Sequence, residues 1–469
     1  MGITGFQQYI KATYPDAIQS RWLDRYDNVY VDMNYLLHRI CAVSSDMADA
    51  LTRTQDYLDT LTKKLRPTKR LVLVSDGFAP MAKLALQQSR RTTGSTREPK
   101  KTAWDWNLHL TLGTEFMTTL GARLGGFVEY IGTQYHIQVI CMFDCAGEGE
   151  TKITSTISRL QRSDPLETHV VLSSDSDMIL MLFGSQIVET VYHIVATNTI
   201  IHYGTMYRIH VKRFGETKTP KDDFVFLNLL MGNDYLPKTK WLRIDRLWDA
   251  YAMLSREYPY GLVRLDRSHE STVSFVLDPL FFHDLIYTAT RHGRMGRFDL
   301  FDPHDQSNGY DNYIKGLYWS YAMYMGGECV DYAYRYTGQA PHPIGVMISG
   351  IAMSNHTMAC ARFDLDPMAG AIIGGILLVP WDRIDILPVG SRDIVARLAR
   401  KFPAIKDRMC VRSYQMICEM IRYVVRYMTG HSMASQSMAR STGCIESIQA
   451  VGMDRYVPKA QRTGMKKLF

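Results

Sequence analysis

The sequence lacks any Cys-x-x-Cys pair or Cys/His cluster with the spacing of a zinc site, although it contains eight cysteines. We therefore expect cysteines that are reduced and structural, as in a cytoplasmic protein. A signal-peptide pattern is also missing at the start, and the longest apolar run, Ala369–Pro380, is too short and glycine-rich to span a bilayer. These absences predict a soluble protein in a reducing, cytoplasmic compartment.

Charge of one sign is in only small excess, at a formal net charge of +7, but basic residues cluster in two places. Lys83–Lys101 holds six basic residues against one acidic residue, and Arg455–Phe469 holds five against none. Such clusters fit a polyanionic partner. The alternative is a solvated basic surface without a partner, and charge alone does not decide between the two.

Short β-branched or apolar runs alternate with longer helical stretches in the first half of the chain. The expected strands are Val29–Met33, Leu71–Ser75, Ile137–Phe143 and Val170–Ser174. Between the first two, leucines recur at helical spacing from Leu51 to Leu65. Strand, helix, strand predicts an α/β fold with a mostly parallel sheet, flanked by helices and joined by right-handed crossovers.

The chain is long enough for two lobes. We expect a first lobe over residues 1–290 and a second, mainly helical lobe over 313–426. A polar stretch, His292–Asn312, reads as a linker between them. From residue 431 to 469 the sequence has no periodicity and predicts a basic, extended tail.

Acidic residues end or follow the expected strands. The positions are Asp32, Asp76, Glu148, Glu150, Asp175 and Asp177. Because the carboxyl ends of parallel strands share one edge of a sheet, these side chains should meet in one crevice. Any one of them is as easily a loop residue or a helix cap. The ordered set is more specific, since a further acid, Asp234, follows in Gly-Asn-Asp.

So many carboxylates cannot ionise together in a cleft without a compensating cation, because each raises the pKa of its neighbours. Ligands that are all oxygen favour Mg²⁺, with Mn²⁺ as a substitute, over zinc. Two such ions about 4 Å apart would activate a water and neutralise the leaving oxygen of a phosphodiester. The pattern therefore predicts a two-metal phosphodiesterase centre.

A helix is expected to start at Pro80, directly after Asp76. Its positions i, i+4, i+7 and i+8 share one face and carry Lys83, Gln87, Arg90 and Arg91. Arg offers bidentate hydrogen bonds to a phosphate and Lys offers a point charge. This face is therefore suited to a terminal phosphate, and a solvated basic face is the alternative. His38, taken alone, is a core or capping histidine.

These residues and their order resemble the XRN family of 5′→3′ exoribonucleases, cousins of the flap endonucleases with their PIN-like fold. The resemblance lies in MGITGFQQYI, DNVYVDMNYLLH, DGFAPMAKLALQQSRR, GTEFM, AGEGETKI, SSDSDMIL and DDFVFLNLLMGNDYLP. It continues more weakly in YIKGLYWSYAMYMGG, YRYTGQAP and DPMAGAIIGGILLVP. Coverage is strong to about residue 240 and moderate to about residue 410.

The resemblance implies a nuclease catalytic lobe whose metal centre holds all seven acids, with Lys83 also acting in catalysis. It implies that Lys83, Gln87, Arg90 and Arg91 bind the 5′-monophosphate of single-stranded RNA, with His38 stacking on the first base and Asn34 also contacting substrate. The expected activity is processive release of mononucleotides. Because the large cellular members carry further domains, the chain resembles a minimal version of the family, such as a virus would encode.

The segment ECVDYAYRYTGQAP departs from the family, which has tryptophan where this chain has none. Tyr332 or Tyr334 would then replace that ring opposite His38 by stacking, beside Tyr336. Two other functions remain open: a flap-type DNA endonuclease, and a nucleic-acid-binding protein that kept the fold without the chemistry. The first lacks support in GNDYLPKTKWLRIDRLWDAY, which has no Gly-x-Gly hairpin. The second conflicts with the presence of all seven acids.

Overall fold

Strand β2 (Tyr26–Asp32) is buried along nearly its whole length, as expected for a central parallel strand covered on both faces. It pairs in parallel with β3 (Pro67–Val74) on one side and with β5 (His169–Leu172) on the other. Strand β4 (Gln138–Met142) extends the parallel array beyond β3. The α/β class and the parallel strands are thus confirmed, with strand ends one to four residues from those expected.

The computed structural model describes residues 3, 5–95, 105–143, 145–269, 271–291, 309–360, 365–406 and 413–432, without the side chains of 89–95 and 430–432. Its contacts define two compact, interleaved units. Unit 1 is Met1–Arg21, Glu150–Glu167 and Ser174–Phe363, and unit 2 is Trp22–Gly149, Thr168–Ser173 and Asp364–Phe469. The expected lobes 1–290 and 313–426 follow a different division and stay a prediction.

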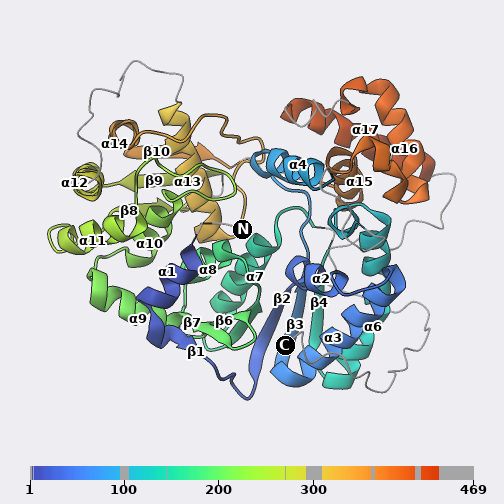
Figure 1. Cartoon of the computed structure of the whole chain (residues 1–469), viewed down its shortest axis with the longest axis horizontal. Helices are drawn as coiled ribbons and strands as arrows, with labels where there is room; N and C mark the ends of the chain where they lie inside the picture. Colours follow the sequence, from blue (N-terminus) through green and yellow to red (C-terminus); the bar gives the residue numbers. More distant parts are fainter. Residues whose placement is uncertain are drawn as a thin grey trace. The chain divides into compact units, whose positions relative to one another are not determined.

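Unit 2 contains the four parallel strands and the helices around them. Besides β2–β5, its elements are α2 (Met33–Cys41), α3 (Met47–Leu65), α4 (Met81–Ser95), α5 (Trp106–His109), α6 (Glu115–Tyr135), α15 (Pro367–Leu378), η4 (Trp381–Ile386), α16 (Val389–Lys401), η5 (Pro403–Ile405) and α17 (Tyr414–Ser432). Helices α3 and α6 pack together beside β3 and β4 (Figure 1). The apolar run from Ala369 is the buried helix α15, which packs on α4 and α17.

Unit 1 is mainly helical but also contains antiparallel strands. Its elements are α1 (Phe6–Thr13), η1 (Pro15–Ala17), β1 (Ile18–Gln19), α7 (Gly149–Ser163), α8 (Ser176–Phe183), β6 (Val191–Ala196), β7 (Thr199–His202), α9 (Tyr203–Phe214), α10 (Pro220–Leu229), α11 (Ile244–Leu254), β8 (Val263–Asp266), β9 (Thr272–Leu277), α12 (Pro279–Thr290), α13 (Tyr310–Gly326), α14 (Pro343–Ala352) and β10 (Asn355–Ala359). Strands β10, β9 and β8 form a small antiparallel sheet (Figure 1). These short strands were not expected from the sequence, because they lie among aromatic-rich helices.

Further expectations, on the linker, the tail, the cysteines and membrane spans, can be compared with the structure. Helix α13 begins at Tyr310, so the end of the expected linker is helical, and residues 292–308 lie outside the described part. Helix α17 continues through Ser432, so the first two residues of the expected tail are helical, and 433–469 are not described. Cys145 forms a disulfide bond, so the prediction that all cysteines are reduced is wrong at this residue. In the described ranges, no helix has both the length and the apolar character needed to cross a membrane.

Candidate metal centre and its surroundings

Asp32 is the last residue of β2 and the N-cap of α2, and it is buried. Its Oδ1 accepts a hydrogen bond from the Tyr35 N–H at 3.1 Å, and its Oδ2 accepts one from the Ser173 hydroxyl at 2.8 Å. Ser173 directly follows β5, the parallel neighbour of β2. Asp32 is therefore a helix cap, as the simpler interpretation held. A carboxylate has about four acceptor positions, so capping leaves room for a cation.

Asp76 lies two residues beyond β3 and makes two hydrogen bonds with Asn34 and one with Gly149. Its Oδ2 accepts from Asn34 Nδ2 and its Oδ1 from the Gly149 N–H, each at 2.8 Å. Asn34 Oδ1 in turn accepts from the Ser75 hydroxyl at 3.0 Å and from the Asp76 N–H at 3.1 Å. These bonds fix the direction of the Asp76 carboxylate. Asn34 thus positions an acid here, and its expected contact with substrate stays a prediction.

Glu148 reaches the same edge because its loop is tied to the loop after β3. The Gly77 N–H donates to the Gly147 carbonyl at 2.8 Å, and the Gly147 N–H donates to the Phe78 carbonyl at 2.9 Å. Both partners of the next contact are buried: Lys83 Nζ lies 2.7 Å from Glu148 Oε1. Lys83 therefore compensates one of the acids, in addition to any role toward a phosphate.

Gly149 shows how closely these acids approach one another. A Cβ built on Gly149 would lie 3.4 Å from Asp76 Oδ1 and 4.0 Å from Asp32 Oδ1. A side chain at residue 149 would therefore contact both carboxylates. As the side chains stand, no three His, Cys, Asp or Glu residues in the described part of the chain already form a metal-binding group. The donor set is nonetheless all oxygen, the chemistry that Mg²⁺ and Mn²⁺ accept.

In unit 1, Asp175 and Asp177 lie at the start of α8. Asp175 is its N-cap, and its Oδ1 accepts from the Asp177 N–H at 3.0 Å. The Tyr324 hydroxyl, from α13, donates to Asp177 Oδ2 at 2.8 Å. Burial raises the pKa of Tyr324 well above its usual range, and the charges of Asp177 and Asp234 add to this. Tyr324 therefore stays a hydrogen-bond donor to Asp177.

Asp234 stands in a tight turn after α10. Gly232 has φ 85°, and a Cβ there would meet the Lys238 N–H nitrogen at 2.7 Å, so the turn requires glycine. Asn233 Oδ1 accepts from the backbone N–H groups of Tyr235 and Leu236 at 2.9 and 2.8 Å. These contacts hold the Gly-Asn-Asp turn, which carries Asp234, in one conformation.

Glu150 lies in the first turn of α7.

The expected phosphate-binding face is described only in part. Helix α4 covers all four positions, with Lys83 buried and Gln87 half-buried, but the side chains of Arg90 and Arg91 lie outside the described part. Helix α4 is held in unit 2 partly by Gln88, whose Nε2 donates to the Leu377 carbonyl of α15 at 3.3 Å. His38 is exposed on α2, so the interpretation as a core histidine is wrong. The phosphate pocket remains a prediction.

Two tyrosines of the segment ECVDYAYRYTGQAP, Tyr332 and Tyr334, are buried in unit 1, and Tyr336 is half-buried. The Tyr334 ring stacks on Trp319 at 5.1 Å, and its hydroxyl donates to the Asn312 carbonyl at 2.8 Å. Tyr332 is buried as well, at 8% exposure, while Tyr336 donates to the Gln339 carbonyl. The Tyr334 ring therefore already has an aromatic neighbour in its own unit. Stacking of Tyr332 or Tyr334 opposite His38 stays a prediction.

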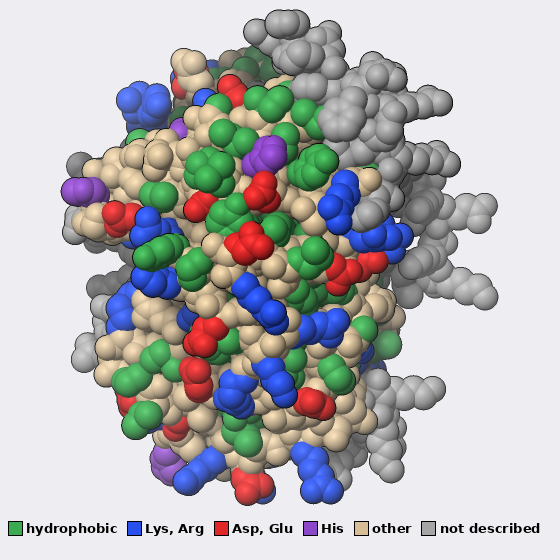
Figure 2. All heavy atoms as spheres, turned by 90° about the vertical axis from the view of Figure 1, so that its left-hand side faces the viewer, with side chains coloured by type: hydrophobic (Ala, Val, Ile, Leu, Met, Phe, Trp, Pro, Cys, Tyr) green, Lys and Arg blue, Asp and Glu red, His purple; other side chains and the backbone are tan. Residues whose placement is uncertain are grey.

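The sequence pattern did not single out Ser173 or Tyr324 as individual site residues. Ser173 acts through one hydroxyl, and a small residue of this kind carries no recognisable pattern. Tyr324 belongs to the quoted motif YIKGLYWSYAMYMGG, so the signal was present without an assigned partner. On the face shown in Figure 2, described Lys and Arg side chains lie among Asp and Glu side chains.

Comparison with known proteins finds similarity in the first part of the chain. Residues 1–192 match the family model described as XRN 5′-3′ exonuclease N-terminus. Among curated relatives, the human 5′-3′ exoribonuclease 1 is 26% identical over 55% of this chain and 18% of its own length. The corresponding protein of Schizosaccharomyces pombe is 27% identical over 52% of this chain and 23% of its own length. The chain thus spans about a fifth of the length of these relatives.

Among solved structures, the catalytic core of Rad2 in complex with DNA substrate is similar with a TM-score of 0.34 and 14% identity, covering 75% of this chain and 94% of that one. A TM-score of this size carries no conclusion about function. The sequence match is the informative one, because it spans the segments that place Asp32, Asp76, Glu148, Glu150, Asp175 and Asp177. Residues 1–192 thus match the XRN 5′-3′ exonuclease N-terminus model, a match that covers less than half of the chain.

Proposed function

We propose that the protein is a 5′→3′ exoribonuclease that degrades 5′-monophosphorylated single-stranded RNA processively to mononucleotides, with two Mg²⁺ ions as cofactors. The observation that carries the proposal is the gathering of Asp32, Asp76 and Glu148 at the carboxyl edge of the parallel strands. Ordered hydrogen bonds hold the two aspartates, and a buried lysine contacts the glutamate. The relatives named 5′-3′ exoribonuclease support the direction and the substrate class.

Chain connectivity supports assigning the remaining acids to the same centre. Glu150 follows Glu148 by two residues, and Asp175 follows Ser173 by two residues. Two residues span at most about 7 Å between Cα atoms. By chain connectivity alone, Glu150 therefore lies within that distance of Glu148, and Asp175 within that distance of Ser173, which donates to Asp32. The assignment of Asp177 and Asp234 rests on the family resemblance. Within unit 1, the Tyr324 hydroxyl donates to Asp177, and the charges of both aspartates raise the pKa of Tyr324.

In the proposed reaction, a water attacks the phosphorus that joins the first two nucleotides, and the bond from that phosphorus to the 3′-oxygen of the first nucleotide breaks. The 3′-oxygen receives a proton, and the phosphate stays on the 5′ end of the remaining RNA. Divalent ions bound by the carboxylates would supply a more acidic water and charge neutralisation for the leaving oxygen. The residues of the chain supply orientation: Asn34 and the Gly149 N–H aim Asp76, and Ser173 aims Asp32. Lys83 balances the charge of Glu148 and lies on the helix expected to grip the 5′-phosphate.

The test is an assay of the purified protein with Mg²⁺ on labelled RNA bearing a 5′-monophosphate, 5′-hydroxyl or 5′-triphosphate, and on flapped DNA. We expect stepwise release of mononucleotides from the monophosphate substrate. Asp175→Asn should abolish it, because Asn keeps the helix cap and removes the charge. Asp46→Asn is the matched control, since Asp46 caps α3 in the same manner.

Other outcomes favour other functions. Equal cleavage of 5′-hydroxyl RNA would contradict the phosphate pocket, and internal cuts in flapped DNA would indicate a flap-type endonuclease. Binding without cleavage would indicate a nucleic-acid-binding protein. Within the exonuclease hypothesis, Arg90→Ala should reduce the preference for a 5′-phosphate more than it reduces Mg²⁺ binding measured by calorimetry.

A further inference from the structure

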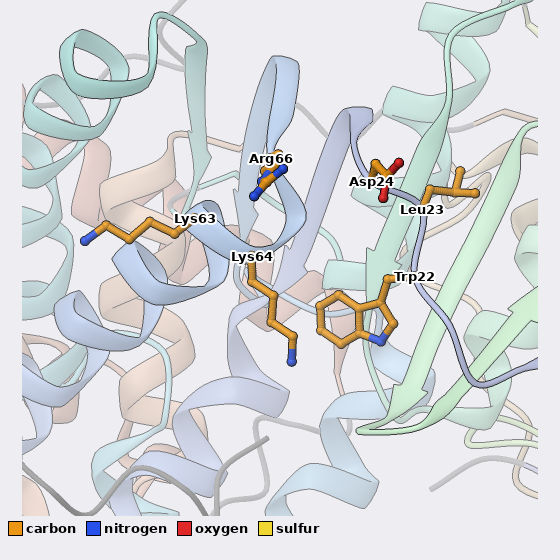
Figure 3. A pocket seen from close by; sticks show the side chains of 6 residues that line it. All are labelled: Trp22, Leu23, Asp24, Lys63, Lys64 and Arg66. Carbon is orange, nitrogen blue, oxygen red and sulfur yellow. The ribbon is translucent and has the colours of Figure 1, made fainter.

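A pocket open to solvent lies in unit 2 at the amino-terminal edge of the parallel strands, away from the acids. Its volume is about 400 Å³, and Figure 3 shows the residues that line it: Trp22, Leu23, Asp24, Lys63, Lys64 and Arg66. Trp22–Asp24 lead into β2, while Lys63, Lys64 and Arg66 end α3 and lead into β3. The pocket therefore lies beside the starts of the neighbouring strands β2 and β3.

The distance to the acidic edge follows from strand length. β2 runs from Tyr26 to Asp32, and a strand advances about 3.3 Å per residue, so roughly 20 Å separate the two ends. A ligand in the pocket would therefore not touch Asp32 or Asp76. Any role of the pocket is separate from hydrolysis.

The loops around the pocket are held in place. Arg66 adopts a left-handed conformation, with φ 47°, as the C-cap of α3 immediately before Pro67. Such a conformation is unfavourable for a residue with a side chain, and glycine is the usual choice there. On the other side, the Leu23 N–H donates to the Tyr26 hydroxyl at 3.1 Å. The turn thus carries an exposed guanidinium at a position that favours glycine.

The lining combines cations with an aromatic ring. Lys64 Nζ lies 3.9 Å from the centroid of the Trp22 ring, a cation–π contact. Lys63 pairs with Asp59 at 2.6 Å, so part of its charge is balanced. Within the described residues, the exposed side chains of Arg66 and Asp24 make no hydrogen bond or ion pair. The pocket therefore offers a half-buried indole, positive charge and one acceptor.

We propose that this pocket binds a nucleotide unit of single-stranded RNA, as a second contact remote from the acids. Single-strand binders combine basic residues that follow the phosphates with aromatic rings on which bases stack. Here Lys64 and Arg66 meet a phosphate, Trp22 stacks a base, and Asp24 accepts from a base N–H or ribose hydroxyl. The carboxylates of an acidic peptide would pair with the cations of the pocket. Such a peptide would leave the indole without a stacking partner, and the charge of Asp24 would repel it.

The first test reads out Trp22 directly and does not depend on cleavage. The full chain, labelled with 5-fluorotryptophan, has seven Trp signals, and Trp22→Phe identifies one of them. A short 5′-hydroxyl oligouridylate is added in EDTA, where the proposed hydrolysis is silent. We expect the Trp22 signal to move with saturation. A signal that does not move would overturn the proposal, whether or not the protein is a nuclease.

The ligand class is decided by competing probes. Inorganic phosphate alone should move the Trp22 signal far less than the oligouridylate, and an oligoglutamate should not compete with RNA. An equal response to phosphate would reduce the pocket to a simple anion site. Stronger binding of oligoglutamate would assign it to an acidic protein partner. Either result contradicts the nucleotide proposal.

Variants complete the test by fluorescence anisotropy on the same RNA. Arg66→Gly removes the guanidinium at a backbone conformation that glycine adopts freely, so the fold is retained. It should weaken binding and lower the slope of log affinity against log salt by about 0.7. Trp22→Ala should weaken binding roughly tenfold. The control is Arg123→Ala, an exposed arginine of α6 outside the pocket, which should change neither quantity. An unchanged salt slope in Arg66→Gly would exclude a phosphate contact.

Discussion

Lys83 Nζ lies 2.7 Å from Glu148 Oε1, with side-chain exposures of only 11% and 6%. A buried charge whose partner is removed costs far more than an exposed one, since water no longer solvates it. The contact therefore makes Lys83 part of the charge balance of the acidic edge. A divalent cation bound there would take over some of that balance.

Lys83→Gln should lower the free energy of unfolding in EDTA by about 3 kcal/mol, measured by urea denaturation. Mg²⁺ should restore more stability to this variant than to the wild type. Lys63→Gln is the control, because Lys63 pairs with Asp59 at 2.6 Å but is 61% exposed, and it should cost less than about 1 kcal/mol. Equal losses at the two positions would show that burial does not set the difference.

Asn34→Ala should weaken metal binding by roughly 10- to 100-fold, as expected for a group that orients a ligand. The reason is the loss of the 2.8 Å bond from Asn34 Nδ2 to Asp76. Calorimetric titration with Mn²⁺ measures the effect, and Asn107→Ala, at an exposed position of α5, is the control. Unchanged Mn²⁺ affinity combined with weaker RNA binding would instead support the substrate role expected from the family resemblance.

Tyr324→Phe should reduce the rate of RNA hydrolysis several-fold or more, because Asp177 loses a hydrogen bond worth about 1.5–3 kcal/mol. Tyr318→Phe is matched to it: Tyr318 is also buried on α13, but its hydroxyl donates to the Met353 carbonyl at 2.9 Å. Both variants should lose stability, and only Tyr324→Phe should lose activity in single-turnover assays. Equal activities would make Tyr324 a purely structural residue.

His210 should make the protein less stable in acid. Its ring lies among the rings of Phe183, Phe224 and Trp248. Its Nδ1 is hydrogen-bonded to the Tyr14 hydroxyl at 2.9 Å. Burial lowers the pKa of His210 from 6.5 to about 3. As the pH falls below about 6.5, His210 therefore binds a proton in the unfolded chain but not in the folded chain. Its contribution to stability is complete above about pH 6.5 and is lost as the pH drops toward 3.

The loss attributable to His210 is on the order of 4 kcal/mol across that window. His210→Gln should flatten the dependence of unfolding free energy on pH between 6.5 and 3, although it lowers stability at neutral pH. The control is His136→Asn, at an exposed left-handed position where Asn is tolerated. A wild-type slope in His210→Gln would place the acid sensitivity elsewhere.

Much of the candidate metal site was predictable from local sequence pattern. A run such as LVLVS has apolar residues on both faces, so both faces are stable only when they are covered, as in a central parallel strand. Strand β3 confirms this expectation. Asp32 and Asp76 could be assigned to one edge since parallel strands share their carboxyl ends. The short strands β8, β9 and β10 were missed, because four to six residues carry too little periodicity to separate them from aromatic helices.

The α/β class, the acids that follow the strands and the match to the XRN exonuclease N-terminus are all accessible from the residue pattern. Three contacts became visible only in the folded chain: Lys83 contacts Glu148, Asn34 orients Asp76, and Tyr324 donates to Asp177. The fold also placed Trp22 beside Lys64 and Arg66, about forty residues away in the chain. The physical reason is that strand and helix patterns are short-range, whereas these contacts depend on how distant segments pack.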